Sequence, residues 1–285
     1  MNIMLLENRS QTTESRLIKK LHYCWFGYGQ FGEKEKKCIE SWKRFLPDFE
    51  IIRWDESNFD LNSCKYVKEA YEAKKWAFVS DYARFKILHE HGGLYLDTDV
   101  EIIRPPITLL KSPFMGIESD PFSSTGLTVN PGLGMYAVPF MPIYEEILLS
   151  YESDSFKSGN GQDGLVTVVT RTTEILKKHG LRQDNSIQNI AGITIYPSDY
   201  LNPKDYETGE IALTENTYSI HHYSMSWFDK RQHFEYKIRS YLMRKGMQRS
   251  RAFKLGSLLG AIRYCDIQKI KNYIARSGKQ GSKQQ

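Results

Sequence analysis

Residues 80–101 read SDYARFKILHEHGGLYLDTDVE, and this stretch decides the fold that we expect. It predicts a helix, a stop at Gly92-Gly93, a short apolar strand, and two aspartates, Asp97 and Asp99, where the strand ends. Residues two apart in a strand point to the same side, so both carboxylates can converge on one small target. Hard oxygen ligands suit Mg²⁺ or Mn²⁺, which often take their other ligands from water and substrate phosphates. The stretch predicts a site for a metal and a diphosphate, with a solvated acidic turn as the alternative.

Strand and helix patterns alternate on both sides of this stretch. The predicted strands are residues 21–25 and 49–54, and the predicted helices are residues 34–45, 62–75 and 78–91. Such alternation indicates an α/β protein with a mostly parallel sheet and helices on both faces. Ligands of these sheets bind beyond the carboxyl ends of the strands. Because Trp25 and Asp97 both follow predicted strands, we expect them to face one cleft.

Composition indicates one enzyme-sized domain with an appendage. The chain has 285 residues, of which 40% are hydrophobic and 26% charged, as is ordinary for a globular protein. Its four cysteines form no CxxC pair, which favours a reduced, cytoplasmic protein over a disulfide scaffold. The sequence predicts no signal peptide, and no apolar run approaches the roughly 18 residues that span a bilayer.

Charge divides the chain into an acidic body and a basic tail. Residues 230–285 contain 15 Lys/Arg and two acids, which leaves 24 Lys/Arg and 32 acids for residues 1–229. We therefore predict a catalytic domain over residues 1–228 and a basic helical extension over residues 229–285. Such asymmetry points to a nucleic acid or an anionic membrane.

The composition of the extension favours the membrane. It has no zinc pattern and no aromatic RNA-binding motif, so we expect no nucleic-acid partner. Its apolar residues recur at near-helical spacing with basic residues between them, which suits a helix lying on anionic lipid. The glycines at positions 246, 256 and 260 predict several short helices rather than one long helix. The alternative is that these are ordinary helices packed on the body.

The central motif resembles glycosyltransferase family 32. The pattern Ser-Asp-x-x-Arg at residues 80–84, followed by Gly-Gly-x-Tyr-x-Asp-x-Asp at residues 92–99, is similar to the motif of these DXD-containing sugar transferases. The family includes bacterial capsule and polysaccharide enzymes and yeast mannosyltransferases, and the glucosyltransferase domains of large clostridial toxins are more distantly similar. Residues 22–27, 38–42, 50–54 and 218–223 resemble further segments of the family. The resemblance covers about residues 18 to 228.

This resemblance implies a fold and an activity. The fold is the GT-A, Rossmann-like nucleotide-sugar-binding fold. The activity is a metal-dependent transfer of a hexosyl group with retention of anomeric configuration, using Mn²⁺ or Mg²⁺. The implied donor is a nucleotide sugar, with a UDP-sugar favoured and GDP-mannose as the alternative. The implied acceptor is a glycan or lipid-linked oligosaccharide of capsule or exopolysaccharide synthesis, and the alternative is a protein acceptor, as in the toxins.

The resemblance also assigns donor-site roles to four residues. Trp25 stacks on the nucleotide base, Asp81 and Arg84 contact the donor sugar and its phosphate, and Asn130 contacts the sugar. The residues themselves allow other interpretations. Trp25 can be a core tryptophan, and Asp81 and Arg84, three apart on one helix face, can form an internal ion pair. Asn130 lies in a turn-rich loop, where asparagine is common for conformational reasons.

The motif around His221-His222 resembles the closing loop of these enzymes. Adjacent residues of a strand point to opposite sides, so at most one of the two histidines can face the site. His222 precedes Trp227 by five residues, and the resemblance makes His222 the third protein ligand of the metal beside Asp97 and Asp99. It makes Trp227 the residue that closes over the leaving nucleotide.

One other enzyme class begins with a strand followed by Asp-x-Asp. Phosphatases of the haloacid-dehalogenase type carry Thr or Val two residues after the second aspartate, near the chain start. Here that position is Glu101, far from the chain start, which disfavours this class.

Taken together, the motifs, the cysteines and the charge distribution lead us to expect a cytoplasmic glycosyltransferase. Its basic extension would hold it peripherally at the inner face of the plasma membrane.

Overall fold

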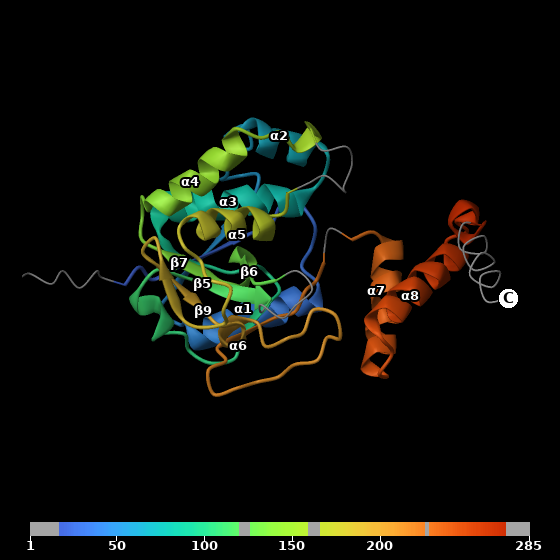
Figure 1. Cartoon of the computed structure of the whole chain (residues 1–285). Helices are drawn as coiled ribbons and strands as arrows, with labels where there is room; N and C mark the ends of the chain where they lie inside the picture. The colour runs from blue at the N-terminus through green and yellow to red at the C-terminus, as the bar shows by residue number, and fades with distance from the viewer. Residues whose placement is uncertain (1–16, 120–125, 159–165, 226–227, 272–285) are drawn as a thin grey trace, which may run out of the picture.

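The structure, a computed structural model, describes residues 17–119, 126–158, 166–225 and 228–271. One mixed β-sheet lies between two layers of helices, with α2, α3, α4 and α5 on one face and α1 and α6 on the other (Figure 1). The predicted α/β class and the helices on both faces are confirmed. The architecture agrees with a GT-A, Rossmann-like fold.

The elements follow one another along the chain in a largely alternating order. The strands are β1 Lys20–Cys24, β2 Glu50–Trp54, β3 Gly93–Tyr95, β4 Val100–Ile102, β5 Phe114–Ser119, β6 Thr128–Asn130, β7 Met135–Ala137, β8 Gln188–Ile190, β9 Ile193–Tyr196 and β10 Ser219–His221. The α-helices are α1 Glu33–Phe45, α2 Lys65–Glu72, α3 Trp76–His91, α4 Pro142–Glu152, α5 Val168–Lys178, α6 Ser198–Leu201, α7 Lys230–Arg244 and α8 Arg249–Arg263. Within the described ranges, the short 3₁₀ segments are η1 Leu109–Lys111, η2 Pro131–Leu133 and η3 Phe156–Ser158.

The main sheet has the order β2-β1-β3-β7-β5-β9-β8, with β6 beside β5. Pairs β1/β2, β1/β3 and β5/β9 are parallel, whereas β3/β7, β5/β7, β5/β6 and β8/β9 are antiparallel. The prediction of a mostly parallel sheet is therefore wrong. Parallel neighbours need a long crossover, whereas antiparallel strands can be joined by a tight turn. β8 and β9 are joined by Ala191-Gly192, both at positive φ, as a two-residue hairpin turn requires.

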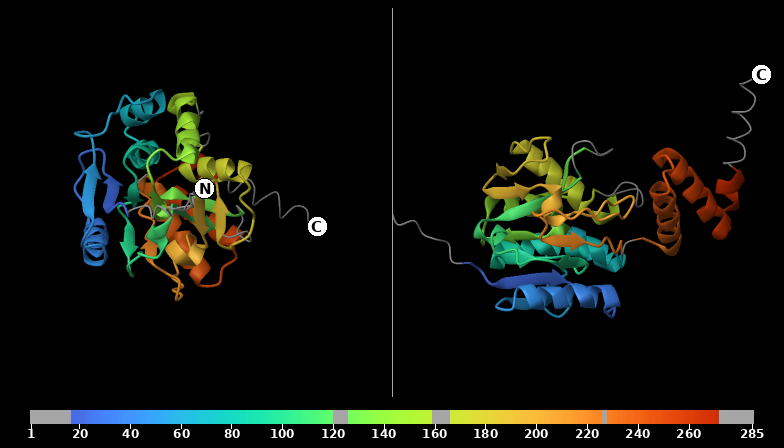
Figure 2. Two further views of the ribbon diagram at one scale, coloured as in Figure 1. Left: turned by 90° about the vertical axis from the view of Figure 1, so that its left-hand side faces the viewer. Right: turned by 90° about the horizontal axis from the view of Figure 1, so that it is seen from below.

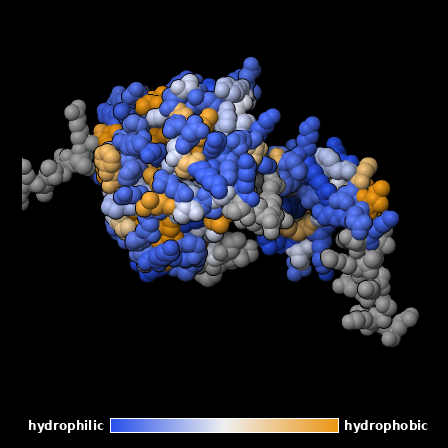
Figure 3. All heavy atoms as spheres, turned by 90° about the horizontal axis from the view of Figure 1, so that it is seen from above, coloured by the Kyte–Doolittle hydropathy of each residue, from blue (hydrophilic) through white to orange (hydrophobic). Residues whose placement is uncertain are grey.

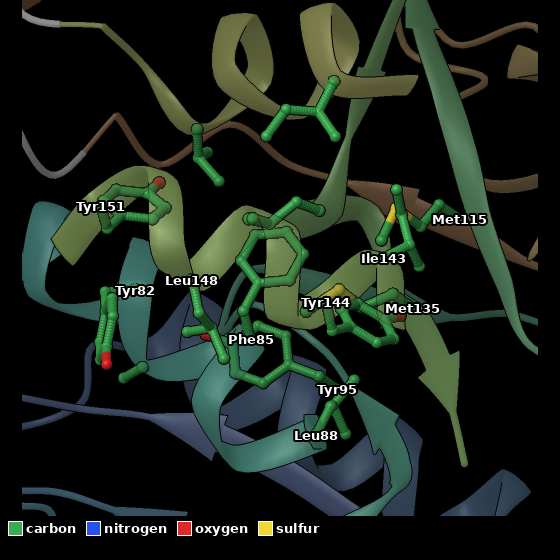
Figure 4. Close-up of a cluster of buried hydrophobic side chains, with 14 of the residues drawn as sticks. Tyr82, Phe85, Leu88, Tyr95, Met115, Met135, Ile143, Tyr144, Leu148 and Tyr151 are labelled. Carbon is green, nitrogen blue, oxygen red and sulfur yellow. The ribbon is translucent and has the colours of Figure 1, made fainter. Parts of the chain in front are cut away.

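Helix α3 lies at the centre of the larger core. Its apolar side chains pack against α4 and the sheet, as Figure 4 shows for Tyr82, Phe85 and Leu88 facing Tyr144 and Leu148. Phe85 and Leu88 are fully buried. Burial of a side chain of this size contributes about 1.5–3 kcal/mol. The helix that carries Asp81 and Arg84 is thus held on several sides by core contacts.

Gly92 and Gly93 turn the chain from α3 into β3. Both have positive φ, 61° and 99°. A Cβ on Gly92 would lie 3.0 Å from the Ala137 carbonyl oxygen, and one on Gly93 would lie 2.7 Å from the Lys20 carbonyl oxygen. Only glycine fits both the conformation and the space. The predicted stop at this pair is confirmed.

Helix α1 supports the segment that follows β3 from the opposite face of the sheet. Trp42 is fully buried there, and its indole Nε1 donates to the Val100 carbonyl oxygen at 2.7 Å. The Ser41 hydroxyl accepts the Ile102 N–H at 2.9 Å. These bonds bind β4, and the turn before it, to one side of α1.

The extension forms an α7–α8 hairpin that stands to one side of the body (Figures 1 and 2). Helix α7 contacts the body through Tyr236, whose hydroxyl donates to the Tyr206 carbonyl oxygen at 2.7 Å. Gly246 separates the helices at φ 83°, as predicted. Gly256 and Gly260 instead lie within α8, which corrects their predicted role as breaks. They permit close packing on α7, because a Cβ at either position would crowd Glu235. Among the described helices, none has the length and apolar character needed to cross a membrane.

Candidate active site

Asp97 and Asp99 lie in the turn between β3 and β4. The Val100 N–H donates to the Asp97 carbonyl oxygen at 3.0 Å and closes this turn. Both aspartates thus converge because the chain turns, and not because they alternate along a strand as the sequence suggested. Ligand atoms of Asp97, Asp99 and His221 all lie within 4.8 Å of one another. Two carboxylates and one imidazole therefore surround a space that a single divalent cation can occupy.

Strand β10 brings His221 into this group. It runs antiparallel to β4 and pairs His221 with Val100, directly after the turn. The Nε2 atom of His221 lies 3.1 Å from Asp99 Oδ1. The Nε2 atom of His222 lies 2.7 Å from Glu101 Oε2, on the other side of the strand. The structure therefore places His221, and not the predicted ligand His222, beside the two aspartates, since neighbouring strand residues face opposite ways.

The Asp99 carboxylate is held in place from two directions. It lies beside His221, and its Oδ2 accepts the Ser224 N–H at 2.6 Å. Although burial opposes the shift, His221 and this hydrogen bond hold the pKa of Asp99 well below its usual range. Burial likewise opposes protonation of His221, yet the Asp99 carboxylate raises the pKa of His221 above 6.5. Asp99 is therefore an anion at neutral pH and favours a positive charge beside it.

Arg84 is enclosed between two acidic side chains. Its Nη2 lies 3.0 Å from Asp81 Oδ1 and 3.2 Å from Asp97 Oδ1, while its Nε donates to the Ser80 carbonyl oxygen at 3.1 Å. Only 4% of the Arg84 side chain is exposed. The Tyr95 hydroxyl adds a bond to Asp97 Oδ1 at 3.1 Å. This is the internal ion pair that the sequence left as an alternative, and it orients the Asp97 carboxylate.

Burial shifts the pKa values of Asp81 and Asp97, the two carboxylates beside Arg84. It raises the pKa of Asp81 to about 7, against the opposing effect of Arg84. Burial also raises the pKa of Asp97, again with Arg84 opposing the shift. The two carboxylates thus compete for one guanidinium. A cation that binds at the Asp97 carboxylate would relieve this excess of buried negative charge.

Asn130 connects the turn to a third carboxylate. Its Oδ1 accepts the Gly132 N–H at 2.7 Å, and its Nδ2 donates to Glu118 Oε1 at 2.7 Å. A Cβ on Gly132 would overlap the Asp97 carboxylate, so this glycine leaves room for Asp97. Asn130 is both the turn residue and a neighbour of the candidate metal ligands, and its contact with a sugar stays a prediction.

Trp25 lies at the same edge of the sheet as Asp97. It follows β1, which pairs in parallel with β3. Its ring centroid lies 4.5 Å from that of Phe31, and its Nε1 donates to the Gly29 carbonyl oxygen at 2.6 Å. The Trp25 side chain is only partly buried, which leaves ring surface for a planar ligand. Trp227, the other predicted nucleotide contact, lies outside the described residues.

Two residues of the site escape the sequence prediction. Glu118 lies next to the last residue of β5, and burial raises its pKa while Asn130 and His221 oppose that shift. The only sequence sign of Glu118 is an acid at the end of the apolar run FMGIE. The position of His221 depends on the register of β10 against β4, which the sequence does not display. No metal or donor role is predicted for either residue from spacing alone.

Comparison with protein families identifies a known sequence region around the central motif. The family profile described as "Glycosyltransferase sugar-binding region containing DXD motif" matches residues 32–115. This segment runs from the start of α1 to β5 and includes Asp81, Arg84, Asp97 and Asp99. Residues 32–115 therefore match the sugar-binding region of DXD-containing glycosyltransferases, and the resemblance drawn from the motifs is confirmed for this region.

Individual relatives are distant. Subversion of eukaryotic traffic protein A of Legionella pneumophila is 24% identical over an alignment that covers 39% of this chain and 21% of that protein. The chain thus spans about one fifth of the length of this curated relative. Among solved structures, PaToxG glycosyltransferase is 16% identical, with a TM-score of 0.42 over 57% of this chain and 69% of that chain. Galactosyltransferase LgtC, in complex with donor and acceptor sugar analogues, is 14% identical, with a TM-score of 0.33 over 64% of this chain and 74% of that chain.

Proposed function

We propose that this chain, which carries a glycosyltransferase sugar-binding region, is a metal-dependent enzyme that transfers a sugar from a nucleotide-sugar donor. The observation that carries the proposal is the convergence of Asp97, Asp99 and His221 from two distant chain segments. Carboxylates with one imidazole suit Mn²⁺, and Mg²⁺ is the alternative. A bound divalent ion would neutralise the negative charge that grows on the departing diphosphate.

Local details support a cation at these three residues. The Nδ1 atom of His221 is buried and has no hydrogen-bond partner within the described part of the chain. Gly132 leaves space beside the Asp97 carboxylate that any larger residue would fill. Arg84 and Tyr95 hold that carboxylate from behind. These residues orient the ligands before a cation arrives, so little conformational freedom is lost on binding.

The remaining parts of the proposed site concern the donor and the acceptor. Trp25 offers a partly exposed ring for the nucleotide base, and Asn130 lies next to Asp97 where the sugar would meet the metal. We propose a UDP-sugar as donor, with GDP-mannose as the alternative, and retention of anomeric configuration. Both follow from the resemblance to family 32 and are tested by the donor panel below and by the anomeric configuration of the product.

We also propose a glycan or lipid-linked acceptor at an anionic membrane, with the enzyme in the cytoplasm at the inner face of the plasma membrane. Residues 230–271 hold 12 Lys/Arg and two acids, and both acids bind Arg231 at 2.8 Å. The surface of the hairpin is therefore strongly basic. Its exposed large apolar residues are Tyr241, Leu259, Ile262, Tyr264 and Ile267. Figure 3 shows apolar residues on this lobe of the surface among hydrophilic ones.

A protein acceptor is the second candidate. It is suggested by the more distant resemblance to the glucosyltransferase domains of clostridial toxins. The two candidates share the donor half of the reaction and differ in the acceptor. Incubation with radiolabelled donor, followed by separation into lipid extract, polysaccharide and protein, distinguishes them. Label in the protein fraction alone would overturn the glycan acceptor.

The experiment that tests the activity is release of nucleotide from a panel of UDP- and GDP-sugars with Mn²⁺ or Mg²⁺. We expect one donor to be hydrolysed slowly without acceptor and the Asp99→Asn variant to release no nucleotide. Lys36→Met is the matched control, because Lys36 lies on the exposed side of α1 and pairs with Glu33. Full turnover in the presence of EDTA would overturn the metal-dependent mechanism.

A further inference from the structure

The donor's diphosphate needs cationic partners that Arg84 does not supply. The guanidinium of Arg84 is buried and engaged by Asp81, Asp97 and the Ser80 carbonyl oxygen. A nucleoside diphosphate carries at least two negative charges, and the carboxylates of the site repel it. A divalent ion compensates the carboxylates that hold it. Other cationic side chains at the same edge of the sheet are therefore the candidates for contact with the diphosphate.

Lys204 is the first such cation. It lies in the segment between α6 and β10, is partly buried, and its Nζ donates to the His222 carbonyl oxygen at 2.8 Å. The N–H of His222 donates to the Asp99 carbonyl oxygen at 2.9 Å. Lys204 and Asp99, a candidate metal ligand, thus both bind the backbone of His222. An ammonium has three N–H donors, and this contact uses one. Within the described ranges, Lys204 forms no ion pair with a carboxylate.

Lys34 approaches the same place from the first turn of α1. The Ser224 hydroxyl donates to Glu35 Oε1 at 3.3 Å, while the Ser224 N–H binds Asp99 Oδ2 at 2.6 Å. The residue next to Lys34 thus touches the loop that holds Asp99. Lys34 is exposed and, among the residues that the structure describes, has no carboxylate partner. Lys36 and Lys43 of the same helix pair with Glu33 and Glu40.

The two lysines affect each other electrically. Burial lowers the pKa of Lys204, and the positive charge of Lys34 lowers it further, with Asp99 opposing both. Lys34 also acts on Asp99, whose pKa it helps to lower. Both ammonium groups thus act electrostatically around Asp99, where a diphosphate bound to the metal would meet them.

We infer that Lys204 and Lys34 form an anion subsite that binds the diphosphate of the nucleotide-sugar donor beside Asp99. The inference rests on the proposed function and names the phosphate-binding side chains of that site. Lys204 contributes more, because it is partly buried and already positioned by the His222 carbonyl oxygen. Lys34 contributes less, and its effect falls with salt, because exposed charges are screened. Both lysines also stabilise the charge that develops on the departing diphosphate. Removing either lysine should therefore lower kcat as well as the affinity for the donor.

The test measures binding of UDP and GDP to the full chain by calorimetry with saturating Mn²⁺. We expect Lys204→Met to weaken binding of the preferred nucleoside diphosphate on the order of 10- to 100-fold, as loss of a charged hydrogen bond implies. Lys34→Met should weaken it a few-fold at low salt and less at 0.5 M NaCl. Lys204→Arg should retain most of the affinity. Lys36→Met should bind as the wild type does, since Lys36 pairs with Glu33.

Uridine and guanosine serve as probes without phosphate. Their binding should not change in Lys204→Met or Lys34→Met. Mn²⁺ affinity measured without nucleotide should not fall in either variant, since removing a positive charge near Asp99 does not weaken binding of a cation. If both methionine variants bound UDP and GDP as tightly as the wild type does, the subsite would be overturned. The proposed function would remain intact in that case, provided that Asp99→Asn abolishes nucleotide release. If the wild-type protein bound neither nucleotide with Mn²⁺, both proposals would be overturned. Thermal unfolding checks that Lys204→Met remains folded.

Discussion

Asp99 is the residue around which the candidate metal site is arranged, since it contacts His221 and the Ser224 N–H at once. Asp99→Asn keeps an oxygen for that N–H and removes the negative charge. We expect Asp99→Asn and Asp97→Asn to lower nucleotide release by roughly 10²-fold or more, because charge stabilisation of this kind is a large part of the barrier. The measurement is donor turnover at saturating Mn²⁺. Circular dichroism should show a folded protein, and activity of the wild-type level in either variant contradicts the site.

Arg84 affects both the stability of the protein and the orientation of the Asp97 carboxylate. Arg84→Ala leaves Asp81 and Asp97 without their buried counter-ion, and breaking such a pair costs about 3–5 kcal/mol. Because Arg84 orients Asp97, we expect weaker Mn²⁺ binding as well as lower kcat/KM for the donor. Urea unfolding and Mn²⁺ titration measure the two effects. Asp81→Asn is the control, since it removes one charge and leaves the Arg84–Asp97 contact. Unchanged stability of Arg84→Ala would argue against a buried ion pair.

We expect His221 to make metal binding depend on pH. Burial opposes protonation of His221, yet Asp99 raises its pKa, so without metal the imidazole keeps its proton to a higher pH than a free histidine does. A protonated imidazole cannot bind a cation, and Mn²⁺ affinity should therefore rise with pH, by about tenfold per unit below the pKa of His221. Calorimetric titration between pH 6 and 8.5 tests this. His221→Gln should bind weakly at every pH, and a flat wild-type profile would exclude His221 as a ligand.

The His221–Asp99 pair should make the metal-free protein less stable as pH rises above 6.5, whereas Mn²⁺ affinity rises with pH. The raised pKa of His221 contributes stability that is present below the unfolded value of 6.5 and is lost as pH rises through the folded value. The lowered pKa of Asp99 contributes stability above its unfolded value of 3.8, which is lost as pH falls through the folded value. The His221–Asp99 pair is therefore most stabilising between these two unfolded values.

At the scale of elements, the packing of α3 on α4 holds the acidic pair in place. Phe85 is fully buried between them (Figure 4). Phe85→Ala should lower the free energy of unfolding by about 3–5 kcal/mol, because it removes a large side chain and leaves a cavity. Leu149→Ala on α4 is the matched control, since Leu149 is 56% exposed, and it should change stability by less than about 0.5 kcal/mol. Urea denaturation measures both, and equal effects would contradict the packing.

At the scale of the whole molecule, the basic hairpin and the catalytic body have separate tasks in the proposed function. We expect the full chain to float with liposomes that contain anionic lipid, and truncation after Asp229 to abolish flotation. Each Lys or Arg near the surface contributes about 1 kcal/mol, so binding should weaken with salt. Ile262→Glu with Ile267→Glu should also reduce flotation, because both side chains are exposed. Equal recovery of full-length and truncated protein in the unbound fraction would reject membrane binding.

Local sequence determined the elements whose signals lie within a few residues. Helical periodicity ending at Gly92-Gly93 predicts α3 and β3, and their ends in the structure lie close to the predicted ones. Asp97 and Asp99 were recognisable because the motif is contiguous. The helical extension was recognisable from the spacing of its apolar residues. In each case the deciding interactions join residues that are near one another in sequence.

Only the tertiary structure decided the relations between distant segments. His221, rather than His222, joins the aspartates because β10 pairs with β4 in one register, and a shift by one residue would exchange their faces. Arg84 is an internal partner of Asp97 because α3 is buried beneath the turn. Lys204 meets His222 only because the loop before β10 folds back on its end. The sequence specifies which side chains are present near each strand end, and strand register and helix packing determine which of them face one another.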